Sequence, residues 1–203
     1  MKIKGSGSFT DATGRNRRIL GVGELSDDEK LRELKVSGNI SSDKIFCDEV
    51  NILGKCEGKF ISAKNFSASG KMEIDSLKVE QTVDMKGNPE LGSVEAKEII
   101  IESRSGSIDE IKCRNLKIFN HVSEADSAFV IKIFGEKISN YDNFSRVRIK
   151  NIDAAKIELE NCAVDIVRCQ DAFIGSNCVI KKLFVAGEYK VAVDSTIGET
   201  IRI

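Results

Sequence analysis

The stretch Val50-Asn-Ile52-Leu-Gly54-Lys-Cys-Glu-Gly58-Lys-Phe-Ile61-Ser-Ala63-Lys-Asn-Phe66-Ser-Ala68-Ser-Gly70 decides the fold. It contains two pairs in which apolar and polar residues alternate, Ile61 with Ala63 and Phe66 with Ala68, and two polar residues separate the pairs. Alternation with a period of two predicts a strand with one buried face. The two-residue interruption changes the parity, so the chain must turn a corner there before the next strand faces inward again.

This unit recurs along most of the chain. The residues that end its copies lie at positions 38, 54, 70, 87, 103, 120 and 135, so successive copies are offset by 15 to 17 positions, and the unit returns at 152–159 and 178–185. Short strands joined by corners at such a period predict a parallel β-solenoid, in which each residue stacks on its equivalent one turn away, about 4.8 Å along the axis. We therefore expect an all-β, single-domain β-helix with turns of 16–17 residues. Three short walls would each contribute two inward side chains per turn.

The composition agrees with this fold and excludes several functions. Ile and Val together number 40 against 10 Leu, and β-branched residues favour strands. The 31 basic and 32 acidic residues give a net charge of −1, which argues against nucleic-acid binding through phosphate neutralisation. No apolar run is long enough to span a membrane, and the chain opens without the apolar core of a signal peptide. We expect a cytoplasmic protein without a cofactor.

The six cysteines are interpreted as buried free thiols. None lies at C-x-x-C spacing, so no metal site is predicted, and a disulfide framework would need an oxidising compartment. Cysteines also stand where other copies of the unit carry Ala, Val or Ile, which is typical of small core residues; these are Cys47, Cys113 and Cys178.

Two regions interrupt the regularity. Residues 1–30 are expected to form an irregular or capping segment, in which 26–34 fits either a capping helix or an irregular first turn. The solenoid would then cover 31–203, with an insertion near 119–146, and Pro89 would lie in a turn after Gly87. One basic cluster falls in the first segment and is interpreted as a solvated tail, with anionic lipid or an acidic partner as the alternative; it comprises Arg15, Arg17 and Arg18.

Over roughly residues 31–200 the chain resembles the bactofilins. Their turns typically show an apolar pair, a glycine, three residues and a second glycine, which Gly54 and Gly58 match, while Gly38 and Gly70 keep the first glycine. The segments 3–8 and 174–183 also resemble bactofilin ends. The resemblance implies a right-handed β-helix of triangular section and a polymer-forming bacterial cytoskeletal protein. It implies end-to-end assembly without nucleotide and a scaffolding role in processes such as cell shape.

The same resemblance defines the expected partners. They are further copies of the chain, either alone or together with a homologous chain. The balanced charge predicts no nucleic-acid partner, and no small-molecule substrate is expected. Some bactofilins attach to the membrane through a short N-terminal tail, which leaves a membrane-proximal location open.

The ends of a solenoid are the expected sites of assembly. Each end exposes unpaired backbone groups and an open apolar core, which must be capped or meet another chain. No catalytic residue, cofactor site or metal site is predicted. The candidate interface residues are Leu31, Leu34 and Val36 at the front and Phe184, Val191 and Val193 at the back.

Two other functions stay open. An interaction module would recruit partners through the Lys and Glu side chains of the walls. A hexapeptide-type acyltransferase is suggested locally by 173–180, but the turns of those enzymes are longer than the turns predicted here, and they usually need a histidine base, for which His121 is the only candidate. The acidic run 27–29 fits a solvated turn or a helix start.

Overall fold

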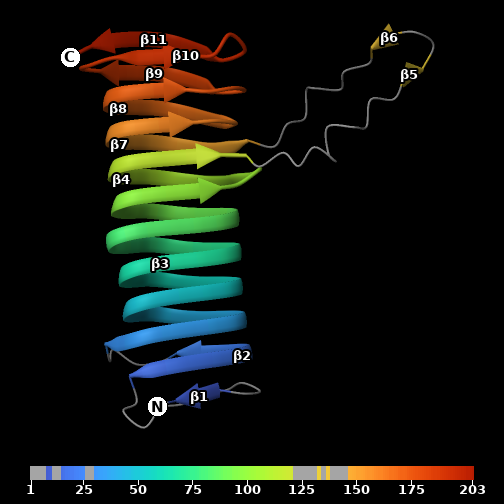
Figure 1. Cartoon of the computed structure of the whole chain (residues 1–203), viewed down its shortest axis with the longest axis vertical. Coiled ribbons are helices and arrows are strands. Elements are labelled where there is room, and N and C mark those ends of the chain that lie inside the picture. The colour runs from blue at the N-terminus through green and yellow to red at the C-terminus, as the bar shows by residue number, and fades with distance from the viewer. Residues whose placement is uncertain (1–7, 11–14, 26–29, 121–131, 134–135, 138–145) are drawn as a thin grey trace.

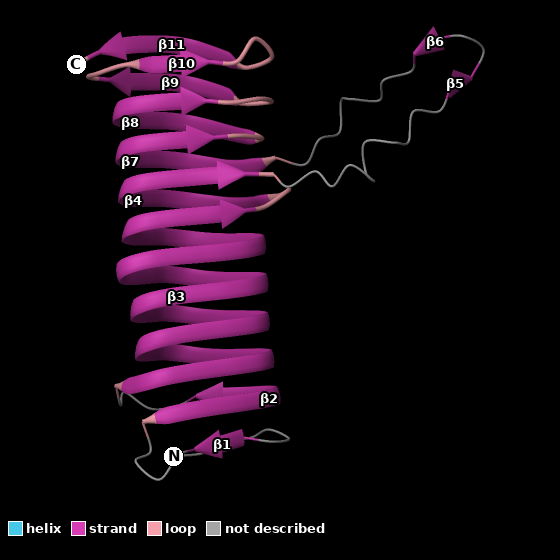
Figure 2. Cartoon of the chain, viewed as in Figure 1, coloured by secondary structure: helices cyan, strands magenta, loops and turns pink. Residues whose placement is uncertain are grey.

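The structure is a computed structural model that describes residues 8–10, 15–25, 30–120, 132–133, 136–137 and 146–203. These residues form strands and loops, and no helix occurs among them (Figure 2). Accordingly, the described chain has no helix that could cross a membrane. The strands are β1 (Ser8–Thr10), β2 (Asn16–Leu25), β3 (Leu31–Glu102), β4 (Gly106–Phe119), β5 (Lys132–Ile133), β6 (Glu136–Lys137), β7 (Val147–Leu159), β8 (Cys162–Ile174), β9 (Val179–Val185), β10 (Tyr189–Val191) and β11 (Thr196–Arg202).

The chain winds into one column of stacked turns, here called rungs (Figure 1). The main sheet has the order β1-β2-β3-β4-β7-β8-β9-β11, with β10 paired to β8. Every pairing in it is parallel except that between β1 and β2. The all-β solenoid expected from the sequence is therefore confirmed, and β3 alone makes several rungs.

The register repeats with the spacing that the sequence predicts. Arg17 pairs with Leu34, a step of 17 in the numbering, and Ala163 pairs with Val179, a step of 16. Between β7 and β8 the step shortens to 15, as in the pair of Ile149 and Val164. Inward residues thus stay stacked although the rungs differ in length.

Three walls enclose the core. Wall A holds the inward pair Val50 and Ile52 with its equivalents in other rungs, and wall C holds Ile61 and Ala63 with theirs. Wall B lies between them and was not assigned residue by residue from the sequence. Its inward residues include Ile40, Cys56, Met72, Ile74, Leu91, Ile108, Ile149, Val164 and Ile180.

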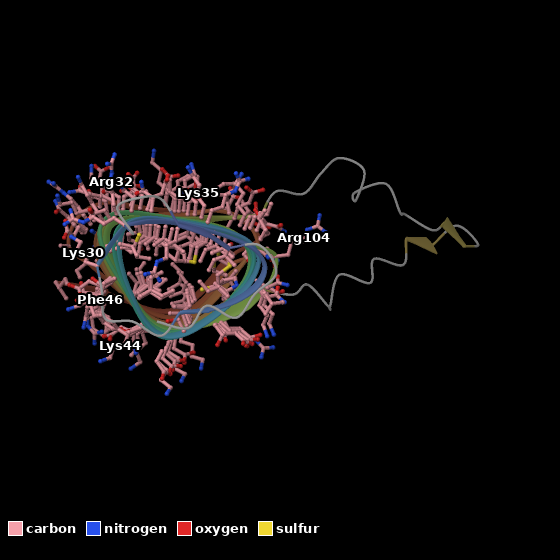
Figure 3. The ribbon with its side chains drawn as sticks, turned by 90° about the horizontal axis from the view of Figure 1, so that it is seen from below. Lys30, Arg32, Lys35, Lys44, Phe46 and Arg104 are labelled. Carbon is pink, nitrogen blue, oxygen red and sulfur yellow. The ribbon has the colours of Figure 1, made fainter. Side chains whose placement is uncertain are left out.

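Seen along the axis, the ribbon closes around this core, and charged side chains such as Lys35 and Lys44 project away from it (Figure 3). Many of them pair with the opposite charge one rung away. Lys59 Nζ lies 2.8 Å from Asp43 Oδ1, and Lys78 Nζ lies 3.4 Å from Glu95 Oε2. Such exposed pairs contribute little stability individually. They keep the walls polar and solvated.

Glycine forms the corner between walls A and B in the first half of the column. Gly54 has a φ of +131°, and a Cβ placed there would lie 2.0 Å from the carbonyl oxygen of Gly38 in the neighbouring rung. Only glycine tolerates both conditions. In later rungs Asn161 and Asn177 occupy this corner with φ of 55° and 57°, a left-handed conformation that asparagine accepts. Asn177 Nδ2 donates to Asn161 Oδ1, so these two side chains are joined across the rungs.

Several sequence predictions need correction. Pro89 does not lie in a turn: it is buried within β3, and the following rung accommodates it with Gly106, whose added Cβ would lie 2.8 Å from the proline Cδ. Cys178 belongs to wall B, next to Cys162, and not to the wall of Cys47. Of the unit expected at 131–135 the structure describes only Lys132 and Ile133, and these do not belong to a rung, because β5 pairs antiparallel with β6 in a separate small sheet.

The two irregular regions can now be placed. Within the segment 1–30, β2 forms a regular rung that pairs in parallel with β3 over its whole length. The insertion leaves after Phe119, the last residue of β4, and the parallel pairing resumes with Gly106 opposite Val147. The segment 26–29, including the acidic run, and His121 lie outside the described residues.

Candidate functional site

At the N-terminal end, the candidate interface residues are covered. Leu31, Leu34 and Val36 are 4 %, 0 % and 3 % exposed, and β2 stacks on the last two, with Arg17 opposite Leu34 and Ile19 opposite Val36. The prediction that Leu34 and Val36 lie at the open end was therefore wrong, while Leu31 is buried without being paired to β2. The sequence reasoning missed β2, since its inward residues include an arginine and a glycine and do not show the apolar pair of the other rungs.

The outermost rung at this end carries Arg17 over Leu34 and Ile19 over Val36. Both are buried, with exposed fractions of 5 % and 1 %. Arg17 therefore points into the column and is not part of a solvated tail, whereas Arg15 and Arg18 are exposed as expected. The strand β1 lies directly against these residues, with Thr10 opposite Arg17 and Ser8 opposite Ile19.

The C-terminal end is different, because apolar side chains of its last rung reach solvent. Val191 is 37 % and Val193 is 106 % exposed, so these two candidates do lie at the end of the column. Phe184 does not: it belongs to the rung below, faces outward, and is stacked between Ile201 of β11 and the Arg168 guanidinium, 5.1 Å from the ring centre. Two further exposed apolar residues were missed, namely Tyr189 and Ile203.

Tyr189 and Arg202 form a contact across this end. Tyr189 lies on wall A and stacks on Ala172, and Arg202 lies on wall C and stacks on Val185. The Arg202 guanidinium lies 5.1 Å from the Tyr189 ring centre and donates to the Gly187 carbonyl. Such a cation–π contact between partly exposed groups is worth about 0.5–1 kcal/mol. It covers one corner of the end and leaves Val191 and Val193 open.

Five of the six cysteines are buried, as expected from the sequence, and Cys113 is half-buried against the core. Cys113 stacks between Ala96 and Ala154, which confirms its role as a small core residue. Burial raises the pKa of the Cys56 thiol to about 12 and that of Cys113 to about 12. Thiols held in this protonated form are poor nucleophiles and poor metal ligands.

Cys162 and Cys178 form a stacked pair in wall B. A hydrogen bond with Cys178, together with burial, raises the pKa of Cys162, and the same hydrogen bond lowers the pKa of Cys178. Cys162 Sγ also donates to the Glu160 carbonyl at 3.1 Å. Among the described residues no group of three or more His, Cys, Asp and Glu side chains is arranged to hold a metal ion.

Comparisons of the chain with protein-family models, with curated proteins and with solved structures find no match. Among the described rungs, the two ends of the column are the most distinctive surfaces.

Proposed function

We propose that this protein is a non-enzymatic structural scaffold of the bactofilin type, which assembles end to end into cytoskeletal filaments without nucleotide. The C-terminal rung carries the proposal. In the described chain β11 pairs only with β9 and β10 only with β8, so their outer edges have no neighbouring strand. Beside those edges Val191, Val193 and Ile203 expose apolar surface.

An edge of this kind favours contact with another copy. Its free N–H and C=O groups lie at the spacing of a further rung, so a second column can continue the hydrogen-bond ladder. Burial of exposed valine and isoleucine adds about 25 cal/mol for each Å² of apolar area removed from water. Such a contact uses only backbone groups and apolar side chains, so it would form without nucleotide.

The polarity of the walls supports assembly at the ends over assembly at the sides. Ion pairs join successive rungs, for example between Lys117 and Glu158 at 2.9 Å and between Lys181 and Asp165 at 2.7 Å. Charged, solvated walls oppose lateral stacking of sheets. The free edges of the terminal rung are then the preferred site of contact.

Paired substitutions test the proposal. Val193→Arg places a charge at the C-terminal end, and Leu53→Arg is the matched control, since Leu53 is 62 % exposed on wall A within β3 and far from the last rung. We expect filaments of the wild type and of Leu53→Arg by sedimentation and electron microscopy without nucleotide, and single chains for Val193→Arg. Circular dichroism checks that each variant is folded. A wild-type chain that stays monomeric at high concentration, or equal assembly of both variants, would refute the proposal.

The two alternatives predict other results. An interaction module would remain a folded monomer and would bind partners through its walls. A hexapeptide-type acyltransferase is less well supported, because the rungs advance by 15 to 17 positions in the numbering, which is shorter than the turn of those enzymes. A stable trimer in sedimentation would favour that enzyme, since its active sites lie between subunits.

A further inference from the structure

The N-terminal edge of the column already has a strand paired to it. β1 runs antiparallel to β2, with Ser8 opposite Ile19, Phe9 opposite Arg18 and Thr10 opposite Arg17 (Figure 1). It is the single antiparallel neighbour in the main sheet of the described chain, in which all other pairs are parallel. β1 is thus an addition to the edge and does not continue the winding of the rungs.

Equivalent positions at the two ends show what this strand covers. On wall A, the outermost residues are Arg17 and Ile19 at the N-terminal end and Tyr189 and Val191 at the C-terminal end. The first two are 5 % and 1 % exposed, whereas the last two are 36 % and 37 % exposed. The end that carries β1 is therefore closed on wall A, and the opposite end is open there.

A covering strand and another copy would compete for the same place. Neighbouring strands lie about 4.8 Å apart, so the terminal rung of a second column would have to occupy the position that β1 holds. β1 and β2 belong to one chain and are separated by only five residues, 11–15, so their pairing is intramolecular, with an effective concentration of order mM. A second column at µM concentration then meets the free edge only when β1 has left it.

We propose that β1 is a displaceable cap on the N-terminal edge, which must detach before the terminal rung of a second copy can stack on β2. This inference rests on the proposed end-to-end assembly and adds its regulation. With β1 in place, two columns join through their open C-terminal ends and growth stops; with β1 detached, both ends are available and growth continues into open filaments. Any condition that detaches β1 would then control filament length.

Two opposite variants of the full chain test the cap. In an antiparallel pair only alternate residues direct their backbone N–H toward the partner strand. Phe9→Pro/Thr10→Pro therefore removes one N–H that bonds to β2, whichever of the two residues supplies it. Phe9→Val/Thr10→Val is the control, because valine favours strands. Phe9→Cys/Arg18→Cys puts cysteines at two directly opposed backbone positions, so that oxidation to a disulfide locks β1 onto β2. The same protein reduced with dithiothreitol is the control for the lock.

We measure filament length by electron microscopy and growth by light scattering. The proline variant should grow faster and form longer filaments than the valine control, and the oxidised lock should stop at particles of two chains until it is reduced. Growth of the oxidised lock at the rate of its reduced form, or equal filament lengths for the proline and valine variants, would overturn the cap while leaving end-to-end assembly intact. Monomers in every variant and in the wild type would instead overturn the proposed assembly itself.

Discussion

The glycine corner gives the sharpest test of the fold, through the substitution Gly54→Ala. The new Cβ would lie 2.0 Å from the Gly38 oxygen, 2.8 Å from its carbonyl carbon and 3.2 Å from its Cα. All three are backbone atoms, so no side-chain rotation relieves the contact. The φ of +131° adds backbone strain of about 1–3 kcal/mol for any residue with a Cβ. Because the neighbouring peptide must also move, we expect a loss of about 3 kcal/mol or more in the free energy of unfolding.

Gly58→Ala is the matched control at a nearby position of the same rung. Its Cβ would lie 3.2 Å from the Ser42 oxygen and 3.6 Å from Ile61 Cδ1, and Gly58 is not among the residues with positive φ. Alanine there reduces the entropy of the unfolded chain, worth about 0.4–1 kcal/mol, which offsets the tighter contact.

Calorimetry and urea denaturation measure both variants against the wild type. For a chain of this size a loss of about 3 kcal/mol lowers Tm by roughly 6–12 °C. We therefore expect a large fall for Gly54→Ala and little change for Gly58→Ala. Equal losses in the two variants, or a neutral Gly54→Ala, would refute the stacking of glycine backbones at this corner.

Two further predictions concern the core. Phe66→Ala removes the largest of the fully buried side chains and should cost about 3–5 kcal/mol by urea denaturation, whereas the exposed Phe173→Ala should change the midpoint little. Cys56 should react slowly with iodoacetamide in the native protein at pH 9 and rapidly in urea, since burial raises its pKa to about 12. Because the thiol has a higher pKa in the folded protein than in the unfolded chain, its burial contributes fully to the free energy of unfolding below the unfolded pKa near 9. This contribution is lost as the pH rises from 9 toward the folded pKa of about 12. A urea midpoint that does not change between pH 9 and 11 would contradict the raised pKa.

The inward pairs of walls A and C could be predicted from the sequence because their spacing hardly varies. The pair Ile61 and Ala63 is followed after two residues by the pair Phe66 and Ala68, and the equivalent pairs of nearly every other rung have the same spacing in the sequence. Wall B was harder, since its first inward position holds residues as different as Met72 and Pro89. The corner before that wall keeps one length where it holds glycine, as from Ile52 to Cys56, but it changes length in later rungs, as from Leu159 to Cys162, and the period drifts there.

The ends were predicted less well than the rungs, for a physical reason. A terminal rung needs only one stacked neighbour, so its inward positions accept residues that an inner rung would exclude. Arg17 and Arg202 stand at such positions, and neither fits an apolar repeat. The repeat therefore located the first exposed candidates one rung too far inward, at Leu34 and Val36, while Val193 was placed correctly because no further rung covers it.

The unequal steps of the register have a consequence for how such a chain can change over evolution. Walls need equal lengths to keep their hydrogen bonds, but corners do not, so a residue gained or lost at a corner leaves every stacked pair in place. The insertion is the extreme case: Ile118 precedes it and Leu159 follows it, and the two still pair as neighbours in adjacent rungs. Corners therefore absorb changes in sequence length, and two descendants of one ancestor can keep the same column while a fixed-period alignment of their sequences loses its phase.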